Sequence, residues 1–137
     1  MVDTSEVPAD VREKIRSDPY CERLDIDVTG LEPGRARVEM TITEDLCNFH
    51  GTPHGGAIYS LADAAFAAAS NSHGDDAYGL ETNISYLDTV DVGETMAATA
   101  EETHVAGRTA EYEVVVTGPD GERVATFRGR VYRPGVE

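Results

Sequence analysis

This sequence carries very little positive charge. Lys14 is its single lysine, and 11 Lys and Arg residues stand against 26 Asp and Glu residues, for a net charge of −15. Phosphate backbones and anionic membranes repel such a chain, so we expect it to bind neither. The acidic residues are spread along the whole chain rather than gathered in a tail. This distribution is typical of halophilic proteins, which work in molar salt where charge repulsion is screened; the alternative is an ordinary acidic protein.

The sequence also lacks long apolar runs and has few cysteines. No apolar stretch reaches the roughly 18 residues of a membrane-spanning helix. The N-terminus shows no basic segment followed by an apolar one, so we expect no signal peptide. Cys21 and Cys47 do not have the spacing of metal ligands, which favours free thiols in a reducing cytoplasm. The 137 residues suit one domain over 1–137, with residues 1–20 as a short helical extension.

The central stretch is residues 48–71, NFHGTPHGGAIYSLADAAFAAASN. From Ala57 to Ser70 it holds seven alanines and neither Gly nor Pro, a composition that predicts a helix. The helix is apolar on nearly every side, so we expect it to be buried. Asp63 sits in its middle, and no Lys or Arg occurs between Arg37 and Arg108 to pair with it. A buried carboxylate without a partner has a perturbed pKa, so we expect histidines, backbone N–H groups or a second subunit nearby.

The rest of the chain alternates between apolar and polar residues, as half-buried strands do. A short helix is predicted at 8–17, ending at Asp18-Pro19, and a hairpin of strands at 24–29 and 35–42. Four more strands are predicted after the long helix, at 78–87, 94–104, 108–117 and 123–132. An α+β fold with one antiparallel sheet wrapped around one central helix satisfies this order. Its exposed edges predict self-association.

Two features of the long helix are candidates for catalysis. His54-Gly55-Gly56 opens it, and the first N–H groups of a helix have no internal partner, so they can stabilise a developing oxyanion. The alternative is that the glycines only relieve crowding against the sheet. Asp63, about two turns further on, lies near the same helix face as Gly56. It is either a catalytic carboxylate or a structural one that bonds to a neighbouring subunit.

Other kinds of site find less support. The possible metal ligands, His50, His54, His73 and Asp63, lack the spacing of helical metal ligands, so no metal is expected. No G-x-S-x-G motif and no dinucleotide fingerprint occurs. In a chain so short of cations, arginines are candidates for contacting a phosphate-bearing ligand, and the alternative for them is cross-strand ion pairing with Glu111 or Glu113. These candidates are Arg108, Arg128, Arg130 and Arg133.

The run NFHGTPHGGAIYSLADAAFAAASNSHG resembles the signature of the phenylacetate-degradation (PaaI-type) acyl-CoA thioesterases of the hotdog fold. The likeness continues at residues 93–100, 107–109 and 124–129, and covers roughly residues 24–133. It implies a sheet wrapped around a central helix. One departure is Asp88-Thr89-Val90, where many relatives carry a basic residue and a proline.

The resemblance also implies roles for individual residues. Asp63 would be the nucleophile or the general base, and the Gly55 N–H would polarise the thioester carbonyl. Asn48 and His54 would orient the thioester, and Thr82 is the nearest match to an assisting hydroxyl. Coenzyme A would be part of the substrate rather than a separate cofactor. Its binding residues would be Gly56, Gly107, Arg108, Thr109 and Arg128.

The expected function is hydrolysis of an aryl- or medium-chain acyl-CoA by a homodimer with shared active sites, or by a dimer of such dimers. One alternative is a non-catalytic acyl-CoA binding protein, although the sequence shows no second, DNA-reading domain. The other is a hotdog dehydratase or hydratase, which needs a histidine-centred acid–base pair. Release of free thiol would separate hydrolysis from both.

Overall fold

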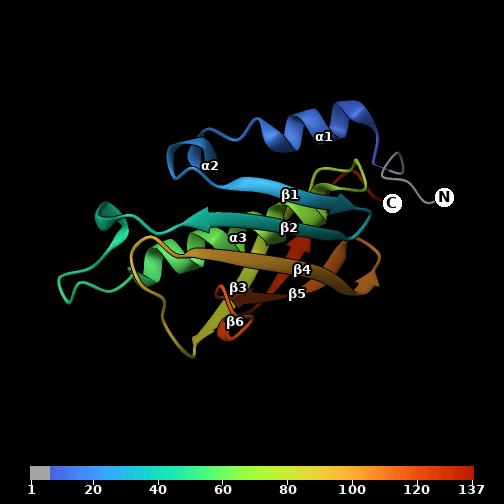
Figure 1. The fold of residues 1–137 in the computed structure, drawn as a ribbon. Helices are drawn as coiled ribbons and strands as arrows, with labels where there is room; N and C mark the ends of the chain where they lie inside the picture. Colours follow the sequence, from blue (N-terminus) through green and yellow to red (C-terminus); the bar gives the residue numbers. More distant parts are fainter. Residues whose placement is uncertain (1–6) are drawn as a thin grey trace.

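The computed structural model describes residues 7–137 and has a single sheet wrapped around a long helix (Figure 1). Six antiparallel strands lie in the order β1-β2-β4-β5-β6-β3. They are β1 (Asp27–Glu32), β2 (Arg35–Thr41), β3 (Tyr78–Tyr86), β4 (Thr95–Ala106), β5 (Thr109–Thr117) and β6 (Arg123–Tyr132). The helices of this part of the chain are α1 (Ala9–Arg16), α2 (Pro19–Arg23), the 3₁₀ turn η2 (Glu44–Leu46) and α3 (Gly55–Asn71). The expected α+β architecture is confirmed.

Helix α3 forms the centre of the core because many of its buried side chains are alanines. Leu61, Ala62, Ala65 and Ala69 have no exposed surface. The helix packs chiefly on β2, β4 and β5. Alanine side chains let the helix axis approach the sheet closely, so the predicted burial of this helix is confirmed.

The helix begins at Gly55, two residues before the predicted start at Ala57. Glycine is a poor helix former, but the His54 side chain compensates as an N-cap. Its Nδ1 accepts a hydrogen bond of 2.8 Å from the Gly56 N–H. This satisfies one of the N–H groups that a helix start leaves without an internal partner.

The N-terminal segment differs from the prediction of one helix followed directly by a strand. The Asp18 carboxylate accepts hydrogen bonds from the backbone N–H groups of Tyr20 and Cys21, which starts a second helix, α2, at Pro19. The strand expected at 24–29 therefore begins later, at Asp27, and ends at Glu32. A residue that caps a helix also looks like a stop signal, which explains the error. Residues 1–6 of the predicted extension lie outside the described residues.

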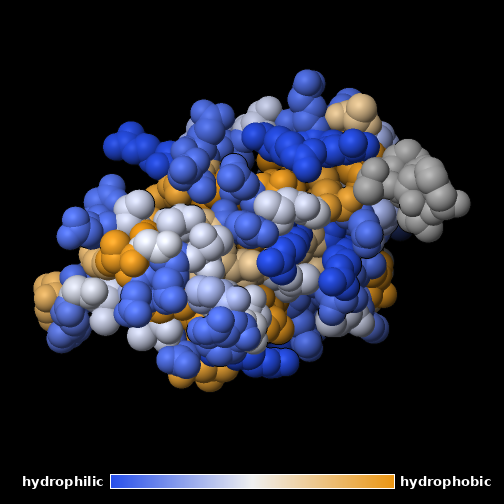
Figure 2. All heavy atoms as spheres, viewed as in Figure 1, coloured by the Kyte–Doolittle hydropathy of each residue, from blue (hydrophilic) through white to orange (hydrophobic). Residues whose placement is uncertain are grey.

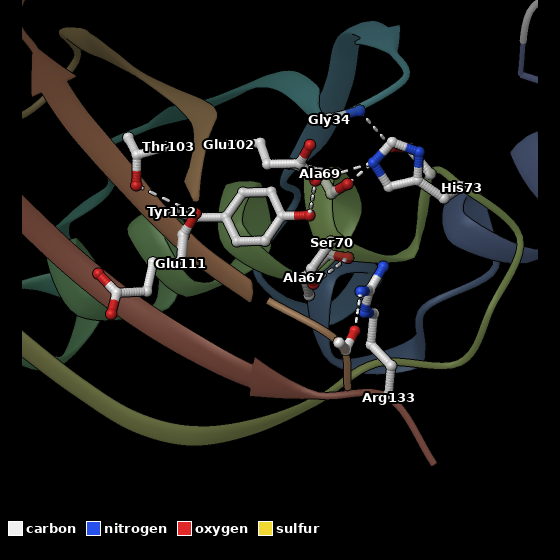
Figure 3. A network of polar contacts seen from close by, with 12 residues as sticks. Gly34, Ala67, Ala69, Ser70, His73, Glu102, Thr103, Glu111, Tyr112 and Arg133 are labelled. Carbon is white, nitrogen blue, oxygen red and sulfur yellow. Dashed lines mark hydrogen bonds and ion pairs between the residues drawn. The ribbon is translucent and has the colours of Figure 1, made fainter. Parts of the chain in front are cut away.

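A polar network ties the C-terminal end of α3 to the sheet (Figure 3). The Glu102 carboxylate accepts a hydrogen bond of 2.6 Å from the Tyr112 hydroxyl and lies 2.8 Å from the His73 Nε2. Partial burial opposes ionisation of Glu102, but these two contacts outweigh it and lower the pKa of its carboxyl. Next to it, the Ser72 hydroxyl accepts from the Gly34 N–H at 2.8 Å. This end of the helix is thereby anchored.

β1 and β3 are the two edge strands of the sheet. β3 is an edge strand paired only with β6, and it carries large exposed apolar side chains, Tyr78, Leu80 and Tyr86. Cys21 and Cys47 are free thiols, as predicted. None of the helices in residues 7–137 combines the length and the apolar character needed to cross a membrane.

Candidate active site

The start of α3 holds a free backbone donor. The Gly55 N–H makes no hydrogen bond with any residue in the part of the chain that the structure describes, whereas the neighbouring Gly56 N–H is taken by His54. A hydrogen bond of 3.0 Å from the Tyr86 hydroxyl on β3 holds the Gly55 carbonyl. Gly55 is thus fixed on its carbonyl side and available on its N–H side, as an oxyanion donor must be.

The loop before α3 is organised by Asn48. Its side-chain oxygen accepts hydrogen bonds from the His50 N–H at 2.9 Å and the Thr52 N–H at 3.2 Å. The loop is closed by a bridge between Cys47 and Pro53. Figure 1 shows this segment, between β2 and α3, projecting beyond the end of the sheet. Phe49 at its tip is 94% exposed, so the loop presents an apolar ring to its surroundings.

Asp63 lies in the middle of α3 and is partly buried. Its carboxylate makes no hydrogen bond or ion pair with any of residues 7–137. Burial and the negative charge of Asp18 both raise the pKa of this carboxyl. The sequence predicted that Asp63 has no cationic partner close to it in the chain. Within one subunit this prediction is confirmed for the described residues.

Three tyrosines near the site were not among the predicted site residues. The Tyr59 hydroxyl lies 2.6 Å from the Thr82 hydroxyl, so the predicted assisting residue is bonded to the turn of α3 that precedes Asp63. The Tyr20 hydroxyl on α2 lies 2.8 Å from that of Ser60, and Tyr86 holds Gly55. The i, i+4 spacing of Tyr59 and Asp63 was the one available signal, since the other contacts join residues far apart in sequence.

The candidate catalytic residues form two groups within one subunit. Asn48, His54 and Gly55 lie at the start of α3, whereas Asp63 and Thr82 lie beside its middle. Eight residues of helix separate Gly55 from Asp63, which is about 12 Å along the axis. A donor and a base that act on the same carbonyl must both lie within about 3 Å of the reacting atoms. The two groups of one chain are too far apart for that.

Apart from Gly56, which belongs to the first turn of α3, the residues expected to bind coenzyme A lie elsewhere. Gly107 and Arg108 form the turn between β4 and β5, at the end of the sheet where α3 finishes. The Arg108 Nε donates to the Val136 carbonyl at 2.7 Å, and Thr109 bonds within the same turn. The Arg128 Nε lies 4.0 Å from Glu111, a cross-strand pairing of the kind considered as the alternative. One subunit does not bring these residues to Gly55, Gly56 or Asp63.

The arrangement suits hydrolytic chemistry on a carbonyl. It offers a partly buried carboxylate as base or nucleophile and a free backbone N–H as oxyanion donor. Among residues 7–137, no three His, Cys, Asp or Glu side chains are grouped so that they could hold a metal ion. A long helix with a glycine-rich start, wrapped by a six-stranded antiparallel sheet, places the chain in the hotdog class.

Comparison with known proteins agrees with this class. The sequence model of the thioesterase superfamily matches residues 50–125. Acyl-coenzyme A thioesterase PaaI of Escherichia coli is 37% identical over 119 residues, which are 87% of this chain and 85% of that protein. Its solved structure superposes with a TM-score of 0.91 at 33% identity, over 97% of this chain and 96% of that one. A mutant of the phenylacetic acid degradation protein PaaI of Thermus thermophilus gives a TM-score of 0.82 at 41% identity, over 85% and 99%.

The chain belongs to the thioesterase superfamily, as a PaaI-type thioesterase of the hotdog fold. The family resemblance of the sequence is thereby confirmed.

Proposed function

We propose that this protein hydrolyses the thioester bond of an aryl- or medium-chain acyl-CoA, with Asp63 as nucleophile or general base. The observation that carries the proposal is the Asp63 carboxylate, which is partly buried and unpaired within its own subunit. The family membership supplies the reaction class, because the related E. coli protein is an acyl-coenzyme A thioesterase. Free thiols at Cys21 and Cys47 suit a cytoplasmic enzyme.

As general base, Asp63 takes a proton from water while the water oxygen attacks the thioester carbonyl carbon. The Gly55 N–H stabilises the negative charge that develops on the carbonyl oxygen. The C–S bond then breaks, and the coenzyme A thiolate leaves and takes up a proton. As nucleophile, the Asp63 carboxylate would instead attack the carbonyl carbon and expel the coenzyme A thiolate, which takes up a proton; the resulting mixed anhydride is then hydrolysed by water. Both routes yield the carboxylic acid and free coenzyme A.

The proposed working unit is a homodimer in which each site combines residues of two chains. The separation of Gly55 from Asp63 within one helix supports this. Two alanine-rich helices packed antiparallel would place Asn48, His54 and Gly55 of one chain over Asp63 of the other. The open β3 edge and the projecting Phe49 supply apolar surface for such an interface. A dimer of dimers would use the same pair.

The nucleotide end of coenzyme A remains assigned to Gly56, Gly107, Arg108, Thr109 and Arg128. Pantetheine is the part of coenzyme A that joins the thiol to the nucleotide. In the proposed dimer, the chain next to the bound pantetheine would supply the Gly107–Thr109 turn. The Arg108 guanidinium is exposed, and its Nε bond to Val136 leaves its other donors available for phosphate.

A thiol-release assay over a panel of acyl-CoAs tests the function. We expect steady-state turnover that peaks on an aryl- or medium-chain substrate. Tight binding without thiol release would mean an acyl-CoA binding protein. Conversion of a 3-hydroxyacyl-CoA without thiol release would mean a dehydratase.

A further inference from the structure

A cavity of about 720 Å³ lies between the N-terminal helices and α3, outside the groups described above. Its apolar walls are Val11 and Ile15 of α1, Ile26 and Val28 at β1, and Ala64 and Ala67 of α3. Figure 2 shows hydrophobic residues in the band between α1 and β1, among hydrophilic neighbours. Its volume falls in the range of roughly 300–1,000 Å³ that small-molecule pockets have.

The cavity adjoins Asp63. Asp63 itself does not line the cavity, but Ala64 follows it in the chain and Ala67 lies one helical turn further on, so the cavity begins on the helix surface next to Asp63. On the opposite side, Asp18 and Cys21 of the α2 region also line it. Asp18 is close enough to Asp63 to raise the pKa of that carboxyl. A carbonyl held at Asp63 would therefore have its acyl chain at the mouth of the cavity.

The charge around the cavity decides which end of the substrate fits. Five acidic residues and two basic ones line it. The acidic residues are Asp18, Glu22, Asp25, Asp27 and Asp76, and the basic ones are Lys14 and Arg16. Lys14 is already paired with Asp76 at 3.0 Å. The excess negative charge opposes the phosphates of coenzyme A and any second carboxylate, and leaves a neutral apolar group as the suitable occupant.

We propose that this cavity is the acyl pocket, and that it selects neutral alkyl or aryl acyl groups over acyl groups that end in a carboxylate. This inference rests on the thioesterase function proposed above and adds the substrate class to it. It makes α1 and α2 the walls that limit acyl length, so the N-terminal segment determines specificity.

Chain-length profiles of three variants test the pocket. Ala64→Leu fills it, and we expect kcat/KM to fall about tenfold or more for octanoyl-CoA while acetyl-CoA stays within about threefold. Ile15→Ala enlarges it, and the optimum should move to a longer chain. Ala9→Leu, on the same helix but outside the cavity, is the control and should leave the profile unchanged. The two shifts in opposite directions cannot both come from damaged folding.

The proposed preference for neutral acyl groups is tested with hexanoyl-CoA and adipoyl-CoA, two substrates that differ by one terminal carboxylate. We expect the wild type to prefer hexanoyl-CoA by about tenfold or more, the size of one unfavourable buried group. Asp25→Asn with Asp27→Asn should reduce this preference. The same charge change at Asp91 and Asp120, away from the cavity, should not.

Two failures are distinguishable. If wild-type protein releases thiol from none of the substrates, the proposed function fails. If it does release thiol, but Ala64→Leu and Ile15→Ala change all chain lengths by the same factor, the acyl group lies elsewhere and the pocket assignment is overturned.

Discussion

Asp63 is held where its charged form is unfavourable, since burial and Asp18 both raise its pKa. The folded protein therefore binds the proton more tightly than the unfolded chain does. Stability linked to this group is highest at low pH and falls as pH rises from the ordinary pKa of Asp to the raised one. At neutral pH the carboxylate destabilises the fold, which is typical of a group kept for function.

The variant Asp63→Asn separates these two effects. It keeps the shape but can be neither base nor nucleophile, so we expect kcat to fall about 10²–10⁴-fold. Because the buried charge is gone, the melting temperature at pH 7 should rise. Thiol release and thermal unfolding measure the two quantities on one sample. Activity within about threefold of wild type would remove the catalytic assignment of Asp63.

Asp18 offers a test of the pKa shift itself. Asp18→Asn can still cap α2 through its side-chain oxygen but removes the negative charge near Asp63. Loss of a like charge lowers the pKa of Asp63, so the acidic limb of the pH profile of kcat/KM should move to lower pH. Asp120→Asn, a remote exposed carboxylate, is the control. A limb that stays in place in both variants would show that Asp18 does not act on the titrating group.

At the scale of elements, the contact between α3 and β6 depends on one glycine. A Cβ on Gly129 would lie 2.6 Å from the Phe66 ring. That ring cannot shift freely, because Tyr112 and Phe127 pack against it with centroids 5.9 Å and 5.5 Å away. The absence of a side chain at this point lets the helix settle on the sheet.

We therefore expect Gly129→Ala to lower the free energy of unfolding by about 1–3 kcal/mol, the usual effect of overpacking. Urea unfolding measures this as a lower midpoint. Gly135→Ala is a suitable control, since nothing lies within 4 Å of its added Cβ. Equal midpoints for the two variants would mean that Phe66 moves aside without penalty.

For the whole molecule, the net charge of −15 sets the salt dependence. Exposed ion pairs such as Lys14–Asp76 and Arg35–Glu101 are few beside the excess of carboxylates. As KCl rises from roughly 0.1 M to above 1 M, screening by the salt shortens the range of the repulsion between the carboxylates. We expect the melting temperature to rise over this range. A sorbitol series of equal osmolality controls for general exclusion effects, and a melting temperature indifferent to KCl would rule out a halophilic protein.

The active site proposed to be shared between two subunits leads to a prediction about mixed dimers. Asp63→Asn protein is mixed with the double variant Asn48→Ala/His54→Ala under subunit exchange. Random exchange makes half the dimers mixed, each with one intact site, so about a quarter of wild-type activity should return. Mass spectrometry of the mixed dimers confirms exchange. Exchange without recovered activity would place both groups of residues in one chain's site.

Local sequence patterns were enough to predict much of this fold. The alanine-rich run from Ala57 to Ser70 and the period-2 alternation of the strands placed α3 and most of the sheet to within a few residues. Both patterns express intrinsic propensity and burial, which act over a few neighbouring residues. The isolation of Asp63 from cations was visible for the same reason, since it is a property of the stretch from Arg37 to Arg108.

Tertiary structure decided what surrounds that carboxylate. The Tyr20–Ser60 contact joins residues 40 positions apart, and the Tyr86–Gly55 bond joins residues 31 apart. The cavity beside Asp63 likewise needs α1, β1 and α3 to meet. No periodicity encodes such meetings, because they depend on how whole elements pack once each has formed. Local patterns were therefore enough to predict the long helix, most of the strands and the unpaired acid, whereas the packing of whole elements placed the distant groups that raise the pKa of that acid and line the space next to it.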